Sequence, residues 1–195
     1  MAIFIIGVIL FLGSHSVRIF ADPWRTSMIE RLGEKKWKGL YTLISLFGFI
    51  VLIIGYGQAR QNTIMIWQPP VFLTHLAVLL NLFTFILLAS SARNNNAIRL
   101  KLKHPMILGV KVWAIAHLLA NGSLVDVILF GSFLIWAVLD FRSARNRPNL
   151  SENTQVVSVK ATISAIFLGV VFWLAFIFGL HQWLIGVSPL AMISR

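Results

Sequence analysis

The sequence predicts an all-α membrane protein, a polytopic bundle of about six transmembrane helices with both termini on the non-cytoplasmic side. Of the 195 residues, 58% are hydrophobic and only 12% are charged, whereas roughly a quarter of residues are charged in an average soluble domain. Apolar runs of about 20 residues, the length that crosses a bilayer, recur along the chain. The Lys and Arg residues gather in alternate loops between these runs, as they do in polytopic membrane proteins.

Six segments are long and apolar enough to cross a bilayer. They are Ala2–Phe20, Leu40–Gln58, Val71–Ser91, Pro105–Asn121, Leu124–Phe141 and Ala161–Val187. No charged residue precedes the first segment and no small-residue cleavage site follows it, so we expect it to be retained as a helix. Only Asn121-Gly122-Ser123 separates the fourth and fifth segments, which predicts a tight turn and an antiparallel helical hairpin.

The loop charges predict the orientation of the chain. When Arg18 at the end of the first segment is counted with the loop that follows, the five loops in order carry 6, 1, 4, 0 and 4 Lys and Arg residues. Cytoplasmic loops are the basic ones, so the odd-numbered loops are predicted to face the cytoplasm. In the first loop, Asp22-Pro23 is a typical helix start, and Trp24, Met28 and Leu32 follow at helical spacing. This pattern predicts a short helix lying on the inner leaflet.

The composition excludes several function classes. A net charge of +11 would suggest a nucleic-acid partner in a soluble chain, but here the cations lie between apolar segments and match anionic lipid headgroups. The absence of cysteine excludes thiolate zinc clusters, thiolate-ligated or covalently attached haem, and disulfides. Asp126 and Asp140 lie at helix ends, and the chain has neither a hydrolase motif nor a phosphate loop. Hydrolysis and proton-coupled transport are therefore not predicted.

Histidine is the residue that stands out in these apolar segments. The five histidines are His15, His75, His104, His117 and His181. An ionisable residue in a membrane span is a functional-site candidate, and neutral imidazole is a good ligand for transition metals. We therefore expect a metal or a haem held between helices. His75 and His181 lie near the non-cytoplasmic ends of their segments, where a structural role is expected.

The fourth segment is the most informative. At 3.6 residues per turn, Gly109, Trp113, His117 and Asn121 line one face of its helix. An imidazole flanked by an aromatic ring and a glycine suits a flat macrocycle, because the ring can stack and the glycine allows close approach. The alternative is a helix–helix seam, where small residues are also common.

Three further residues are candidates for the same site. His104 precedes a proline, so it lies at the helix start near the cytoplasmic surface. Lys111 lies two turns further along, where it either snorkels to the surface or pairs with a carboxylate such as a haem propionate. His15 lies among Gly13, Ser14 and Ser16, and these small neighbours favour a position inside the bundle.

Three sequence blocks resemble the NnrU family over nearly the whole chain, residues 1–195, as a single transmembrane domain. They are Gly13-Ser14-His15-Ser16-Val17-Arg18, His104-Pro105-Met106, and Trp113-Ala114-Ile115-Ala116-His117-Leu118-Leu119-Ala120-Asn121-Gly122. The resemblance implies a multi-pass protein of the bacterial inner membrane, linked to denitrification and to nitrite and nitric oxide metabolism.

The related 15-cis-zeta-carotene isomerase family binds haem b and carries out a redox-gated isomerisation. This similarity implies haem b with His15 and His117 as the iron ligands, and His104 matches a third family histidine. By helical rise, His117 lies roughly 18 Å from the start of its helix, and His15 about 8 Å from the cytoplasmic end of its own. If helix tilt does not compensate for this difference in depth, His15 and His104 are closer to the same depth in the membrane and form the alternative pair of ligands.

These inferences lead to one preferred function and two alternatives. The preferred function is a haem b-binding membrane protein with redox-linked or isomerase-like activity on a hydrophobic substrate. One alternative is a membrane S-adenosylmethionine-dependent methyltransferase, because His104-Pro105 followed by Gly109 resembles a motif of those enzymes. The other is a non-catalytic membrane scaffold or assembly factor. The sequence leaves open the substrate, whether the protein is an enzyme, and the oligomeric state.

Overall fold

The computed structural model describes residues 1–147 and 156–193 and confirms the all-helical membrane fold. Within these residues, five helical stretches are long and apolar enough to cross a membrane, and one further apolar helix is shorter. The longer helices are α1 (Ala2–Phe20), α3 (Glu34–Ala59), α4 (Val71–Ser91), α7 (Leu124–Arg145) and α8 (Val159–Ala175), and the shorter one is α6 (Pro105–Ala120).

The remaining elements are short. They are α2 (Asp22–Leu32), η1 (Arg60–Asn62), α5 (Ala97–Leu102), the π-helical turn η2 (Phe176–Leu180), α9 (His181–Ile185) and α10 (Pro189–Ile193). The predicted surface helix at Asp22-Pro23 is therefore present as α2. It ends at Gly33, whose φ of 81° suits glycine and separates α2 from α3.

The last predicted span is present as a continuous helical stretch, Val159–Ile185, that contains a π-helical turn. The expected segment Ala161–Val187 is divided into α8, the π-helical turn η2 and α9. Gly186 ends α9 in the left-handed conformation, with φ 79° and ψ 9°, so the helix stops before Val187. Because the π-helical turn η2 adds residues to a turn, the residues of α9 face a different direction from the one that a regular α-helix would give them.

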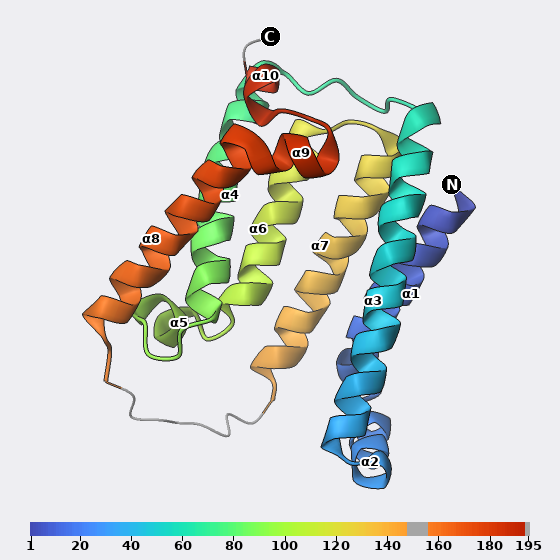
Figure 1. The fold of residues 1–195 in the computed structure, drawn as a ribbon, viewed down its shortest axis with the longest axis vertical. Helices are drawn as coiled ribbons and strands as arrows, with labels where there is room; N and C mark the ends of the chain where they lie inside the picture. Colours follow the sequence, from blue (N-terminus) through green and yellow to red (C-terminus); the bar gives the residue numbers. More distant parts are fainter. Residues whose placement is uncertain (148–155, 194–195) are drawn as a thin grey trace.

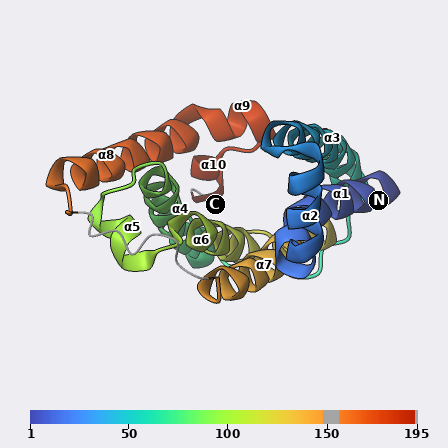
Figure 2. The same cartoon turned by 90° about the horizontal axis from the view of Figure 1, so that it is seen from below.

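The helices form a ring with two distinct ends. Seen from below, α3, α1, α7, α6, α4 and α8 follow one another around the bundle, and α9 returns toward α3 (Figure 2). α10, α9 and the start of α1 lie toward one end of the bundle, and α2 and α5 lie at the opposite end (Figure 1). We call these the terminal end and the basic end, because the loops rich in Lys and Arg all join helices at the latter. Residues 148–155 of the fifth loop lie outside the described residues.

Glycines allow the tightest helix contact, between α1 and α3. A Cβ atom added to Gly7 would meet the backbone of Leu52, and one added to Gly55 would meet the backbone of Phe4. Close backbone approach through small residues is how membrane helices gain packing contacts where lipid supplies no hydrophobic driving force.

The terminal end is closed by backbone hydrogen bonds. Ile66 donates to the Gly122 carbonyl and Leu124 donates to the Ile64 carbonyl, both at 2.8 Å. The predicted tight turn between the fourth and fifth spans is thus present and tied to the segment that follows α3. A side chain on Gly122 would collide with the Trp67 carbonyl, so this contact requires glycine.

Candidate functional site

A cavity of about 650 Å³ lies between the helices toward the terminal end. α3, α4, α6 and α7 form its walls, and the chain from α8 to Pro189 covers the remaining side. Most of the lining is apolar and aromatic. Eight lining residues carry polar or charged groups: Tyr56, Arg60, Thr74, Asn81, His117, Asn121, Asp126 and His181. A concave, mainly apolar cavity with a few polar groups is the usual form of a small-molecule site.

His117 on α6 presents a free nitrogen in this cavity. Its Nδ1 lies 2.8 Å from the Trp113 carbonyl oxygen. A carbonyl oxygen only accepts, so Nδ1 carries the proton and Nε2 keeps its lone pair. The ring stacks on Phe130 at 4.6 Å between centroids and packs against Trp113 at 5.1 Å. Metal-binding histidines commonly donate their other ring N–H to a carbonyl in this way.

His181 on α9 faces the same cavity. Its ring centroid lies 6.4 Å from that of His117, and the two ring planes differ by 22°. Its Nδ1 donates to the Val187 carbonyl at 2.7 Å, so its Nε2 also keeps a lone pair. From its position near the end of its predicted span, His181 was expected to have a structural role. The only available signal was that both histidines fall near the same end of their predicted spans.

A second polar group lies at the terminal-end wall of the cavity. The carboxylate of Asp126 accepts hydrogen bonds from the Tyr56 hydroxyl at 2.6 Å and the Ser123 hydroxyl at 2.7 Å. Ser123 also caps α7, because its Oγ accepts from the Asp126 backbone N–H at 3.2 Å. Arg60 in η1, directly after α3, donates to the Ile185 carbonyl at 3.0 Å and so joins this end of α3 to α9. These contacts hold three sides of the cavity together.

His15 does not line this cavity. Its Nδ1 donates to the Phe11 carbonyl at 2.7 Å, and its ring packs against Phe11 at 4.4 Å, Tyr41 at 5.5 Å and Trp136 at 6.0 Å. The buried indole N–H of Trp136 has no hydrogen-bond partner in the described part of the chain. Aromatic side chains therefore surround His15 at the α1–α7 contact.

The structure does not bring His15 and His117 together. A series of ring contacts joins them through Phe11, Phe133 and Trp113, with centroid distances of 5.8 Å from Phe11 to Phe133 and 5.4 Å from Phe133 to Trp113. They also pack at different levels of α7, since His15 contacts Trp136 and His117 contacts Phe130. Six residues of helix correspond to about 9 Å.

The other predicted site residues divide between the cavity and the helix contacts. Trp113 lines the cavity with His117. A Cβ on Gly109 would lie 3.3 Å from the Leu88 side chain, so this glycine serves the contact between α6 and α4. Nζ of Lys111 lies 3.8 Å from the centre of the Phe141 ring, a cation–π contact.

His104 lies at the basic end, just before α6. Its ring packs edge-on against Phe141 at 6.1 Å. Burial, together with the nearby positive charge of Arg147, lowers the pKa of His104 below its ordinary value. His104 therefore contacts α7 at a level remote from the cavity.

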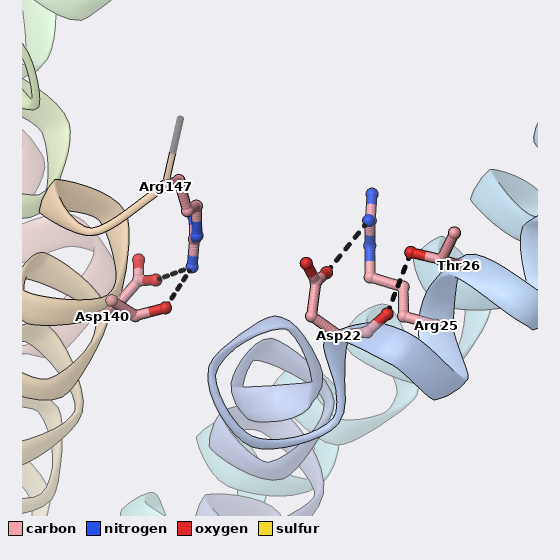
Figure 3. Close-up of polar contacts among 6 residues, drawn as sticks. Asp22, Arg25, Thr26, Asp140 and Arg147 are labelled. Carbon is pink, nitrogen blue, oxygen red and sulfur yellow. Dashed lines mark hydrogen bonds and ion pairs between the residues drawn. The ribbon is translucent and has the colours of Figure 1, made fainter. Parts of the chain in front are cut away.

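Ion pairs mark the basic end. Arg147 donates to the Asp140 carboxylate at 3.1 Å and to the Ser143 hydroxyl at 2.9 Å. Arg25 pairs with Asp22 at 3.3 Å, and Figure 3 shows these two pairs on α2 and at the end of α7. Partly exposed pairs of this kind each contribute about 1 kcal/mol or less.

The donor set of the cavity favours one kind of metal centre. Among the described residues, no group of three His, Asp or Glu side chains is placed to hold a metal ion. A cofactor that carries its own equatorial ligands needs only one or two imidazoles from the protein. The cavity supplies two, each with a free Nε2.

Comparison with known proteins identifies the family. A family model described as NnrU protein matches residues 3–189. No curated protein and no solved structure matches the chain. The matched residues run from α1 into α10, so they include every residue that lines the cavity.

Proposed function

The chain belongs to the NnrU family, and we propose that it is a haem b-binding membrane protein that acts on a hydrophobic molecule within the bilayer. One observation carries the proposal: a large, mainly apolar cavity between membrane helices that contains the lone pair of His117 Nε2. An imidazole nitrogen in an apolar, aromatic cavity is the environment in which proteins hold haem through a histidine.

The residues of the cavity fit this cofactor. His117 would supply a nitrogen ligand to the iron, and its Nδ1–H bond to Trp113 fixes the ring orientation and increases the basicity of Nε2. The aromatic walls offer flat surfaces to a flat macrocycle. Bound haem supplies an iron centre that changes its oxidation state by one electron.

The protein residues control what surrounds that centre. Phe130 and Trp113 hold the His117 ring between them, which limits its rotation. The apolar lining excludes water from most of the cavity. At the terminal-end wall, the Tyr56 hydroxyl donates to the Asp126 carboxylate at 2.6 Å and gives the cavity a polar group.

The rim of the cavity favours a substrate taken from the lipid. Four lining residues are also among the exposed hydrophobic side chains: Phe49 at 43%, Ile53 at 54%, Leu184 at 55% and Ile185 at 45%. Their positions on α3 and α9 indicate that the cavity opens sideways, between these helices. A hydrophobic substrate with redox-linked or isomerase-like chemistry agrees with such an opening, and the link to nitrite and nitric oxide metabolism stays a prediction.

Absorption spectroscopy of the purified protein tests the proposal. Full-length protein expressed with adequate haem supply is expected to show a Soret band, and sharp α and β bands after reduction. The control variant His75→Ala should show the same bands. His75 makes the same bond to a carbonyl four residues earlier, but it is exposed. Protein that stays colourless after incubation with haem would contradict the proposal and favour the scaffold or the methyltransferase.

We also infer that the protein lies in the bacterial inner membrane with its basic end in the cytoplasm. The inference depends on the uninterrupted alternation of loop charges. A reporter active only in the periplasm should give signal when fused after Arg60 or at the C-terminus, and none when fused in the loop after Arg147. A strong periplasmic signal from that loop would reverse the orientation.

A further inference from the structure

We propose that His181 is the second protein residue that would bind the haem iron, together with His117, in place of the predicted His15. This inference depends on the haem-binding function proposed above. It is based on a contact between two residues that are 64 positions apart in the sequence and that meet only because α9 bends across the cavity. His15 packs in a different part of the bundle.

The distance between the two imidazoles suits a shared metal. A metal–imidazole nitrogen bond is about 2 Å long, and each ring centre lies about 1 Å beyond its nitrogen, so two imidazoles on one metal have centres roughly 6 Å apart. The centroids of His117 and His181 are 6.4 Å apart. Their planes differ by 22° in a stacked arrangement, so binding one metal between them requires the rings to turn until both Nε2 atoms face it.

Both rings also have the protonation that ligation requires. Each donates its Nδ1–H to a backbone carbonyl, His117 to Trp113 at 2.8 Å and His181 to Val187 at 2.7 Å. Each therefore keeps the Nε2 lone pair, and neither ring has to lose a proton to bind a metal.

The local fold explains why His181 faces the cavity. In His117 and His75 the accepting carbonyl belongs to the residue four positions earlier, within the same helix. His181 instead bonds to Val187, which lies beyond the left-handed turn at Gly186. The π-helical turn η2 precedes it and shifts the register of the helix by one residue per turn. The two irregular turns together place the imidazole over the cavity.

The two ligands differ in how firmly they are held. His117 lies on a 16-residue helix between two aromatic rings. His181 lies on a five-residue helix between η2 and Gly186, and the Arg60 hydrogen bond to Ile185 anchors that helix to α3. His181 is therefore the ligand expected to dissociate first when an external ligand competes for the iron.

The test compares the spin state of the ferric haem in matched variants of the full-length protein. Wild type is expected to be low-spin with two nitrogen ligands. His181→Ala should retain haem through His117 but become high-spin, and added imidazole should restore the low-spin signal. His15→Ala and the control His75→Ala should resemble wild type, because neither residue lines the cavity.

A second variant keeps the test decisive if His181→Ala is unstable. His181→Met preserves side-chain bulk and offers a thioether, so it should raise the reduction potential, as a Met axial ligand does. A low-spin spectrum unchanged in His181→Ala, or a conversion to high-spin in His15→Ala, would overturn the assignment and leave haem binding intact. Wild-type protein that takes up no haem would instead overturn the proposed function itself.

Discussion

The histidines at the two ends of the bundle make the same hydrogen bond to a backbone carbonyl, but one end has a cavity beside them and the other has packed aromatic rings. At the terminal end, His117 and His181 each donate Nδ1–H to a carbonyl and line a cavity of about 650 Å³. Toward the basic end, His15 also donates Nδ1–H to a carbonyl, but the rings of Phe11, Tyr41 and Trp136 pack around it. The hydrogen bond prepares an imidazole for ligation in both places, and only one of them offers space for a ligand.

To bind a cofactor, a histidine needs both a free ring nitrogen and an adjacent cavity, and one of these can be present without the other. A motif in the sequence reports the imidazole and its immediate neighbours. The volume depends on where helices diverge, and here α9 and α3 are joined by a hydrogen bond rather than by close packing. Four substitutions test this difference between the two ends by their effects on stability or on haem binding.

The largest effect is expected from Gly122→Ala at the terminal end. The new methyl group would collide with the Trp67 carbonyl and break the hydrogen bonds that join the turn to the segment after α3. The free energy of unfolding should fall by about 3 kcal/mol, measured by thermal unfolding in detergent. Gly39→Ala near the basic end is the control, since nothing lies within 4 Å of its added Cβ. Equal losses in both variants would contradict the structure of the terminal end.

Asp126→Ala comes next. It leaves the Tyr56 and Ser123 hydroxyls without their acceptor and should reduce stability by about 2 kcal/mol. A double-mutant cycle with Tyr56→Phe should give a coupling of about 1 kcal/mol. Asp140→Ala, which breaks the partly exposed pair with Arg147, should cost about 1 kcal/mol or less. Strict additivity of the first two changes would show that Tyr56 and Asp126 do not interact.

Filling the cavity should reduce haem binding without unfolding the protein. Ala120 lines the cavity. Ala120→Trp is expected to lower the haem affinity about tenfold, or about 1.4 kcal/mol, in a haem titration. Ile135→Trp on the exposed face of α7 adds the same bulk outside the cavity and should leave the affinity unchanged. Similar affinities in the two variants would mean that haem binds elsewhere.

The smallest effect concerns pH at the basic end. Burial, with Arg147 nearby, lowers the pKa of His104 in the folded protein below its ordinary value of 6.5. The unfolded chain then binds a proton more readily than the folded chain, so stability is retained above pH 6.5 and falls as the pH drops through the folded-state pKa. Unfolding curves of His104→Gln should show a weaker decline over that range. An identical decline would assign the pH dependence to other groups.

The sequence was sufficient to predict where most of the helices lie. The apolar runs predicted α1 and α4 with their observed bounds, and Asp22-Pro23 predicted α2. The π-helical turn between α8 and α9 was not predicted, because Phe176–Leu180 is as apolar as its neighbours and composition does not reveal a π-helical turn.

The site was only partly predictable. Helical spacing placed Trp113 and His117 on one face, and both line the cavity. Gly109, on the same predicted face, packs against α4 instead, because helical spacing does not say which neighbour a face meets. His181 and Asp126 join the site through contacts between distant segments, which periodicity within one helix cannot reveal.

The most direct test of the central claim is the removal and chemical replacement of the His117 side chain. His117→Gly should lose most of its haem, because the side chain that would bind the iron is gone. Adding imidazole should restore haem binding, since the small ligand can enter the space that the side chain leaves. His15→Gly, treated in the same way, should keep its haem throughout. Full haem retention in His117→Gly, or loss confined to His15→Gly, would contradict the assignment of the terminal-end cavity as the haem site.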